Sequence, residues 1–90
     1  MSTNLYLRKL TSFDDFPGWE ERGNAGAKEM IRSDLPREYA RNADGDRLCR
    51  PTDFSAWRKF IVDQEFNAEN WLAMLDVLEA NSDVWIAVSQ

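Results

Sequence analysis

The chain of 90 residues contains no histidine and only one cysteine, Cys49. Without histidine the commonest general base is missing, and neither a Ser/His/Asp nor a Cys/His catalytic arrangement can form within one chain. A single cysteine cannot form an intrachain disulfide, and without histidine it cannot build a thiolate or imidazole metal site. The sequence therefore predicts a non-enzymatic protein with no catalytic residues, no metal site and no cofactor.

Carboxylates are the remaining source of site chemistry. The pairs Asp14-Asp15 and Glu20-Glu21 stand near aromatic residues, but nothing in their spacing fixes the separation that a glycosidase acid/base pair requires. The run from Asn42 to Asp46 resembles the start of a calcium loop, yet its glycine stands inside the run rather than after the third ligand. We interpret this run as a polar turn, and a cryptic enzyme remains the third class of function after an inhibitor and a structural subunit.

Long hydrophobic runs are also missing. No apolar stretch approaches the roughly 20 residues that a membrane-spanning helix needs. The first ten residues, MSTNLYLRKL, lack the apolar region of a signal peptide. Together with the lone cysteine, these absences predict a cytoplasmic protein that does not contact a membrane.

Positive charge is scarce in the second half of the chain, and the formal net charge is −5. Residues 52–90 carry only Arg58 and Lys59 as basic side chains. The acidic surface that results from this imbalance either keeps the protein soluble or steers it toward a basic partner. Either interpretation disfavours direct nucleic-acid binding, which needs clustered lysine and arginine. The acidic residues of this half are Asp53, Asp63, Glu65, Glu69, Asp76, Glu79 and Asp83.

The clearest structural pattern covers residues 67–90. Asn67 is a good helix N-cap, Glu69 complements the helix dipole in the first turn, and Asn81 suits the helix end. The following Val84–Val88 segment is apolar on both faces, as in a strand that is covered on both sides. The pattern places Glu69, Ala73, Asp76 and Ala80 outside, and an apolar stripe inside that consists of Ala68, Trp71, Leu72, Met74, Leu75 and Leu78.

Earlier elements are less sharply marked. Asn4–Leu10 fits either a strand or a short helix, and its alternation favours the strand. Arg47–Arg50 is a short strand candidate with Leu48 inward. Thr52 is expected to cap a helix that ends near Gln64, with Asp53 in its first turn. The apolar stripe of that helix is Phe54, Trp57, Phe60 and Ile61.

Residues 11–41 are predicted to contain a loop followed by two helices. Thr11–Gly23 reads as a loop, because Pro17-Gly18 is a turn pair. Helices are expected over Ala25–Asp34 and from Pro36 to Arg41, separated because the residue before a proline avoids helical angles. Three aromatic side chains of the loop either cover the core or form a contact patch: Phe13, Phe16 and Trp19.

These elements predict one small helix-rich domain over residues 1–90, of the α/β or α+β class. Its sheet has two or three strands, near 5–10, 47–50 and 84–88. If 47–50 and 84–88 are parallel neighbours, the two intervening helices form a right-handed crossover. If 47–50 does not pair, the apolar strand 84–88 keeps an open edge that favours a homodimer over a monomer. A mainly helical domain with one β-ribbon is the alternative.

Thr52-Asp53-Phe54 opens one expected helix, Ala68-Glu69-Asn70-Trp71 enters a second, and a hydrophobic strand follows. With this pattern, residues 47–90 resemble the barstar family of ribonuclease inhibitors. The resemblance implies a parallel sheet with flanking helices, and an acidic second helix that plugs a basic active-site cleft. It assigns partner contacts to Phe66, Leu75 and Asp76, while Leu72 stands where the family has its first helical aspartate.

The predicted function is that of a small acidic protein that binds and inhibits a basic partner. The partner is expected to be a nuclease or another nucleic-acid-handling protein, as for immunity proteins and for inhibitors of phage or plasmid origin. The alternative is a structural adaptor or homodimeric subunit without an inhibitory role. The predicted partner-binding residues are Glu65, Phe66, Glu69, Leu75, Asp76 and Glu79.

Overall fold

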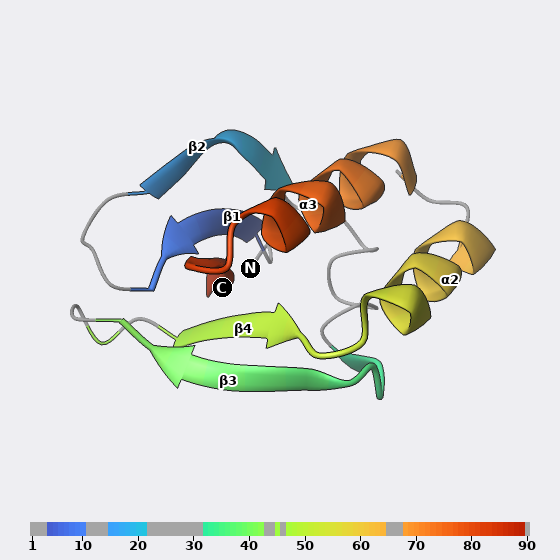
Figure 1. The fold of residues 1–90 in the computed structure, drawn as a ribbon, viewed down its shortest axis with the longest axis horizontal. Helices are drawn as coiled ribbons and strands as arrows, with labels where there is room; N and C mark the ends of the chain where they lie inside the picture. The colour runs from blue at the N-terminus through green and yellow to red at the C-terminus, as the bar shows by residue number, and fades with distance from the viewer. Residues whose placement is uncertain are drawn as a thin grey trace.

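The computed structural model describes residues 4–10, 15–21, 32–42, 45, 47–64 and 68–89. Within these residues, one antiparallel five-stranded sheet in the order β2-β1-β5-β4-β3 carries two helices (Figure 1). The protein is therefore a small α+β domain. The elements are β1 (Asn4–Lys9), β2 (Asp15–Glu21), β3 (Arg37–Arg41), β4 (Arg47–Pro51), α2 (Phe54–Gln64), α3 (Ala68–Ala80) and β5 (Val84–Ser89).

Strand β5 is the centre of the sheet. Its residue Ile86 pairs with Leu7 of β1 on one side and with Cys49 of β4 on the other. The three strands predicted from the sequence are thus confirmed, and β5 has a neighbour along both edges. The open edge that favoured a homodimer is not present.

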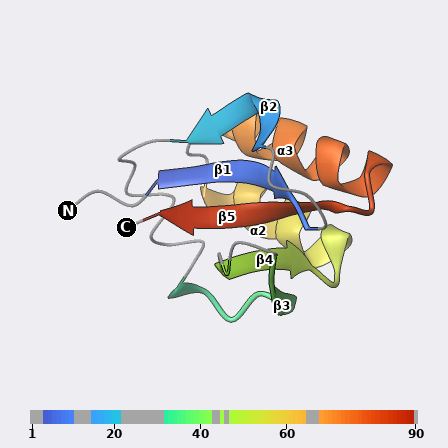
Figure 2. The ribbon, with the colours of Figure 1, turned by 90° about the vertical axis from the view of Figure 1, so that its left-hand side faces the viewer.

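The two faces of the sheet are buried in different ways. Ile86, Leu5 and Leu7 belong to the main core, which also contains the inner sides of both helices. On the opposite face, Trp85 packs with Leu48 in a smaller apolar cluster. Figure 2 shows both helices behind the sheet, so they cover one face only. Trp85 and Ala87 on the other face are buried as well, which confirms that the strand 84–88 is apolar on both faces because both faces are covered.

Both helices bury the stripes that their sequences predict. In α3 the outward set is exposed, and the inward set is buried or half-buried. At the start of α2 the Ala56 amide donates to Asp53 Oδ1 at 3.1 Å, so Asp53 rather than Thr52 is the N-cap. At the end of α3 the Asn81 side chain donates to the Val77 carbonyl at 2.9 Å and satisfies one of the free helical carbonyls.

The parallel pairing of strands 47–50 and 84–88 that would have formed a crossover does not occur, and the parallel sheet that the barstar resemblance implied is wrong. β4 and β5 are antiparallel, with Leu48 opposite Ala87 and Cys49 opposite Ile86. Because two helices connect the strands, β5 begins at the end of the sheet at which β4 stops, and the two strands run in opposite directions. A single crossover helix would have brought the chain back to the other end and made the strands parallel.

Two further predictions are wrong. The loop expected over 11–23 contains β2, and the short helix expected from Pro36 to Arg41 is β3. β2 is an outer strand, where a proline is tolerated, and its pairing with β1 shifts register between Tyr6 and Leu7. β3 forms because it pairs along its whole length with β4.

Some predictions fall outside the described residues. These are Phe13, the Asn67 cap and nearly all of the helix expected over Ala25–Asp34. Phe16 and Trp19 lie on β2, whose backbone alone is described.

Arg50 ties the end of β4 to the end of α3. Its guanidinium donates to the carbonyl oxygens of Leu78 at 2.5 Å, Val84 at 2.6 Å and Asn81 at 3.2 Å. It also lies 5.6 Å from the centre of the Phe54 ring. The last turn of α3 contains no basic residue, so Arg50 supplies the positive charge that a helix carboxyl end favours.

We expect Arg50→Gln to lower the free energy of unfolding by about 2–4 kcal/mol, because three carbonyl groups lose a charged donor. Arg47→Gln on the same strand is the matched control, since Arg47 is exposed. Urea denaturation of both variants measures the difference. Equal stability of the two would show that the carbonyl contacts of Arg50 contribute nothing.

A substitution at Leu75 tests how the main core between the helices and the sheet is packed. Its side chain is fully buried between α3 and the strands, so Leu75→Ala should cost about 2–5 kcal/mol. Val62→Ala on α2 is the control, because Val62 is 55% exposed. A thermal melt of the Leu75 variant that coincides with that of the control would contradict the assigned packing.

Candidate functional site

The exposed face of α3 is the first candidate surface. Its exposed residues are all acidic or alanine: Glu69, Ala73, Asp76, Glu79 and Ala80. We call these five residues the α3 acidic face. It combines negative charge with small, flat side chains, and it leaves no basic group of α3 itself to compensate the charge.

One arginine from α2 partly neutralises the α3 acidic face. Arg58 donates to Asp76 Oδ1 at 3.0 Å and pairs with Glu79 Oε1. The bond to Asp76, followed by that to Glu79, raises the pKa of the Arg58 guanidinium. The pairs are open to solvent, with 75% of the Asp76 side chain exposed, so they hold the charges loosely.

The remaining predicted partner-binding residues do not belong to the α3 acidic face. Glu65 and Phe66 lie outside the described residues. Leu75 is fully buried in the main core, so the partner contact that the resemblance assigned to it does not fit the fold. Of the six predicted residues, the structure thus brings Glu69, Asp76 and Glu79 together on one exposed face.

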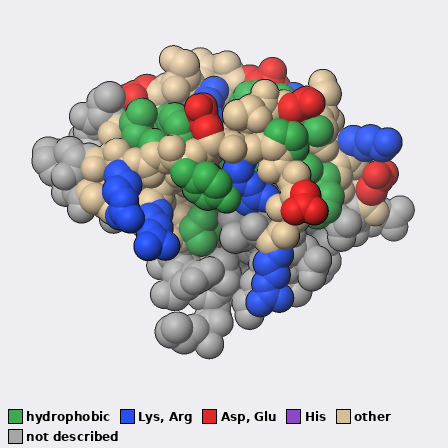
Figure 3. All heavy atoms as spheres, turned by 90° about the horizontal axis from the view of Figure 1, so that it is seen from below, with side chains coloured by type: hydrophobic (Ala, Val, Ile, Leu, Met, Phe, Trp, Pro, Cys, Tyr) green, Lys and Arg blue, Asp and Glu red, His purple; other side chains and the backbone are tan. Residues whose placement is uncertain are grey.

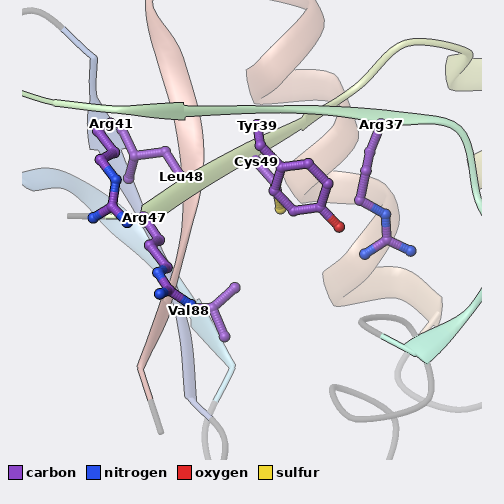
Figure 4. A pocket seen from close by; sticks show the side chains of 7 residues that line it. All are labelled: Arg37, Tyr39, Arg41, Arg47, Leu48, Cys49 and Val88. Atoms are coloured by element: carbon purple, nitrogen blue, oxygen red, sulfur yellow. The ribbon is translucent and has the colours of Figure 1, made fainter. Parts of the chain in front are cut away.

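The β3–β4 hairpin carries a second candidate site, a pocket of about 480 Å³ (Figure 4). Seen from below, the β3 side of the molecule exposes basic groups beside apolar side chains (Figure 3). The pocket is lined by Arg37, Tyr39, Arg41, Arg47, Leu48, Cys49 and Val88. We call it the hairpin pocket.

The three arginines of the hairpin pocket differ in how they are held. Arg37 donates to the Ser33 carbonyl at 2.7 Å and to the Leu35 carbonyl at 3.2 Å, and lies 5.4 Å from the Trp57 ring centre. Arg41 donates to the Gly45 carbonyl at 2.9 Å. Gly45 has a φ of 81°, which suits glycine in the turn. Arg47 is exposed, and no carboxylate of the described residues contacts Arg41 or Arg47.

Cys49 forms part of the pocket wall and of the main core. Burial raises the pKa of its thiol from 9.0 to about 11, an effect that the nearby Arg37 guanidinium partly opposes. The thiol is therefore neutral near pH 7 and a poor nucleophile or metal ligand. Among the described residues no group of acidic, cysteine or histidine side chains is placed to hold a metal ion.

The raised pKa of the Cys49 thiol predicts that the protein becomes less stable at alkaline pH. The unfolded chain releases its proton near pH 9 and the folded chain only near pH 11, so the folded state loses relative stability as pH rises between these values. The loss should total about 2–3 kcal/mol. Urea titrations at pH 8 to 11 measure it, and Cys49→Ala is the control because other groups also titrate there. Identical slopes for both proteins would contradict the assigned burial.

Comparisons with known proteins do not extend these observations. No family model, no curated protein and no solved structure matches the chain. The likeness to the barstar family therefore stays a prediction. No helix of the described residues is long and apolar enough to span a membrane.

The sequence interpretation missed the hairpin pocket. The helix expected from Pro36 to Arg41 would distribute Arg37, Tyr39 and Arg41 around its axis. In a strand, alternate residues share one face, and the three line up. The signal that could have indicated a hairpin is the polar run from Asn42 to Asp46, a turn sequence directly before the strand candidate Arg47–Arg50.

Proposed function

We propose that the protein is a non-enzymatic binding protein that docks its α3 acidic face onto a basic surface of another protein and blocks it. A nuclease or another nucleic-acid-handling protein is the expected partner, because its active cleft must be basic to hold phosphates. The observation that carries the proposal is the composition of the α3 acidic face, which exposes only carboxylates and alanines.

Physical chemistry supports such a role in two ways. Clustered carboxylates accelerate encounter with a basic partner, and fixed charge patterns reject wrong partners. Alanines between them allow close approach and lose no rotamer freedom on binding. Arg58 can leave its exposed pairs with Asp76 and Glu79 at small cost, which frees both carboxylates for the partner.

Charge reversal on the α3 acidic face tests this proposal. Immobilised protein is exposed to a panel of purified basic ribonucleases and deoxyribonucleases, and association rates and residual nuclease activity are measured. For a true partner, Glu69→Lys should slow association severalfold, and Asp76→Lys should add to the effect. Association should also slow as ionic strength rises from about 0.01 M to about 0.15 M, where the screening length falls from about 30 Å to about 8 Å.

Asp34→Lys is the matched control. Asp34 is exposed and precedes β3, and its reversal changes the net charge by the same amount as Glu69→Lys. A partner that responds equally to both variants would show that only net charge matters. If binding does not change with ionic strength, with Glu69→Lys or with Asp76→Lys, the α3 acidic face is excluded as the docking surface.

A further inference from the structure

The β3–β4 hairpin places two positive charges directly opposite each other. Arg41 and Arg47 are cross-strand partners, and their β-carbons are therefore about 5 Å apart. Like charges in this position destabilise a hairpin. Figure 4 shows both side chains extending into the same side of the hairpin pocket. An anion bound between the two guanidinium groups would remove the repulsion and satisfy their donors.

The face of β3 that carries Arg41 also carries Tyr39 and Arg37. Tyr39 stands between Arg41 and Arg37, which lie about 13 Å apart at 3.3 Å per residue. The tyrosine is 74% exposed although it lies beside a pocket. Its ring is thus available for stacking, while Val88 adds apolar surface to the wall. Glu38 points to the other face of the strand by alternation, so it does not neutralise this one.

The size of the hairpin pocket matches a small ligand. Pockets of about 300–1,000 Å³ typically hold small molecules, with mostly apolar walls and a few fixed polar groups. Here about 480 Å³ is lined by three arginines, one tyrosine and three apolar residues. Arg37 is already held by Ser33 and Leu35, so its position needs little reordering on binding.

We propose that the hairpin pocket binds a small phosphorylated aromatic compound of the mononucleotide class. Arg41 and Arg47 hold its phosphate, and Tyr39 stacks on its ring. Arg37 reaches the polar groups at the far end of the ring. A free small molecule fits better than a nucleic-acid strand, because the net charge of −5 repels a long polyanion. The site lies on elements other than α3, so it goes beyond the docking function and does not depend on it.

Calorimetric titration of the intact chain with adenosine monophosphate at low ionic strength tests the proposal. Adenosine, ribose 5-phosphate and inorganic phosphate are the comparison ligands. The mononucleotide should bind at least about tenfold more tightly than each of them, because only it engages both arginines and the tyrosine. Arg41→Gln and Arg47→Gln should each weaken binding of the mononucleotide and of ribose 5-phosphate about tenfold or more. Tyr39→Ala should weaken only the mononucleotide.

Lys59→Gln is the control, since Lys59 is an exposed base on α2 and its loss changes the net charge equally. Melting curves establish that the variants are folded, and the two arginine variants should melt no lower than the parent because a like-charge pair is removed. Absence of binding at millimolar ligand, or equal effects of Lys59→Gln and Arg47→Gln, would overturn the proposal. A single-stranded RNA decamer that binds more tightly than the mononucleotide would also overturn it in favour of a nucleic-acid strand.

Discussion

The fold depends on the contact between Arg50 and the carboxyl end of α3. A helix end leaves several carbonyl groups without intrahelical donors, and α3 has no basic residue in its last turn and ends beside Glu79. Arg50 satisfies carbonyls of the helix, of the following turn and of β5 at once. Burial lowers the pKa of its guanidinium, which Glu38 and Glu79 oppose, so the group stays charged. One side chain thereby fixes where β4, α3 and β5 meet.

The fold also places the negative and positive charges of the molecule on different surfaces. The α3 acidic face lies on the helical layer, whereas the hairpin pocket lies at the β3 edge of the sheet (Figures 1 and 4). The formal charge of −5 therefore describes neither surface. A partner that meets α3 encounters carboxylates, and a ligand at the hairpin encounters guanidinium groups. Opposite potentials on one small domain allow two different binding events without competition for the same residues.

Local patterns predicted the helices and the central strand because those elements bury contiguous apolar stripes. Trp71, Met74 and Leu78 recur at helical spacing, and Val84–Val88 offers apolar groups to both sides. The direction of β4 against β5 could not be read in this way, because it depends on how two helices return the chain. The capping role of Arg50 was equally hidden, since its partners stand 28 to 34 residues away.

Of the two candidate sites, one follows from local sequence periodicity and the other depends on long-range strand pairing. The carboxylates of α3 share a face by helical periodicity alone, so the sequence was enough to group Glu69, Asp76 and Glu79. It was also enough to mark Leu75 as core, and the contact role transferred from a related-looking motif conflicted with that. The arginines of the hairpin pocket come together only through the pairing of Arg41 with Arg47, which the helical interpretation of residues 37–41 concealed.

The central position of β5 has a consequence for the order of folding. Every other described element precedes it in the chain, yet β1 and β4 meet only through it. During synthesis, the two hairpin-like parts β1–β2 and β3–β4 therefore emerge from the ribosome before the strand that joins them. Each exposes an unpaired apolar edge until residues 84–88 appear, so the domain is assembled in a late step and not progressively. A chain that ends before Val84 would lack the strand on which both parts of the sheet depend.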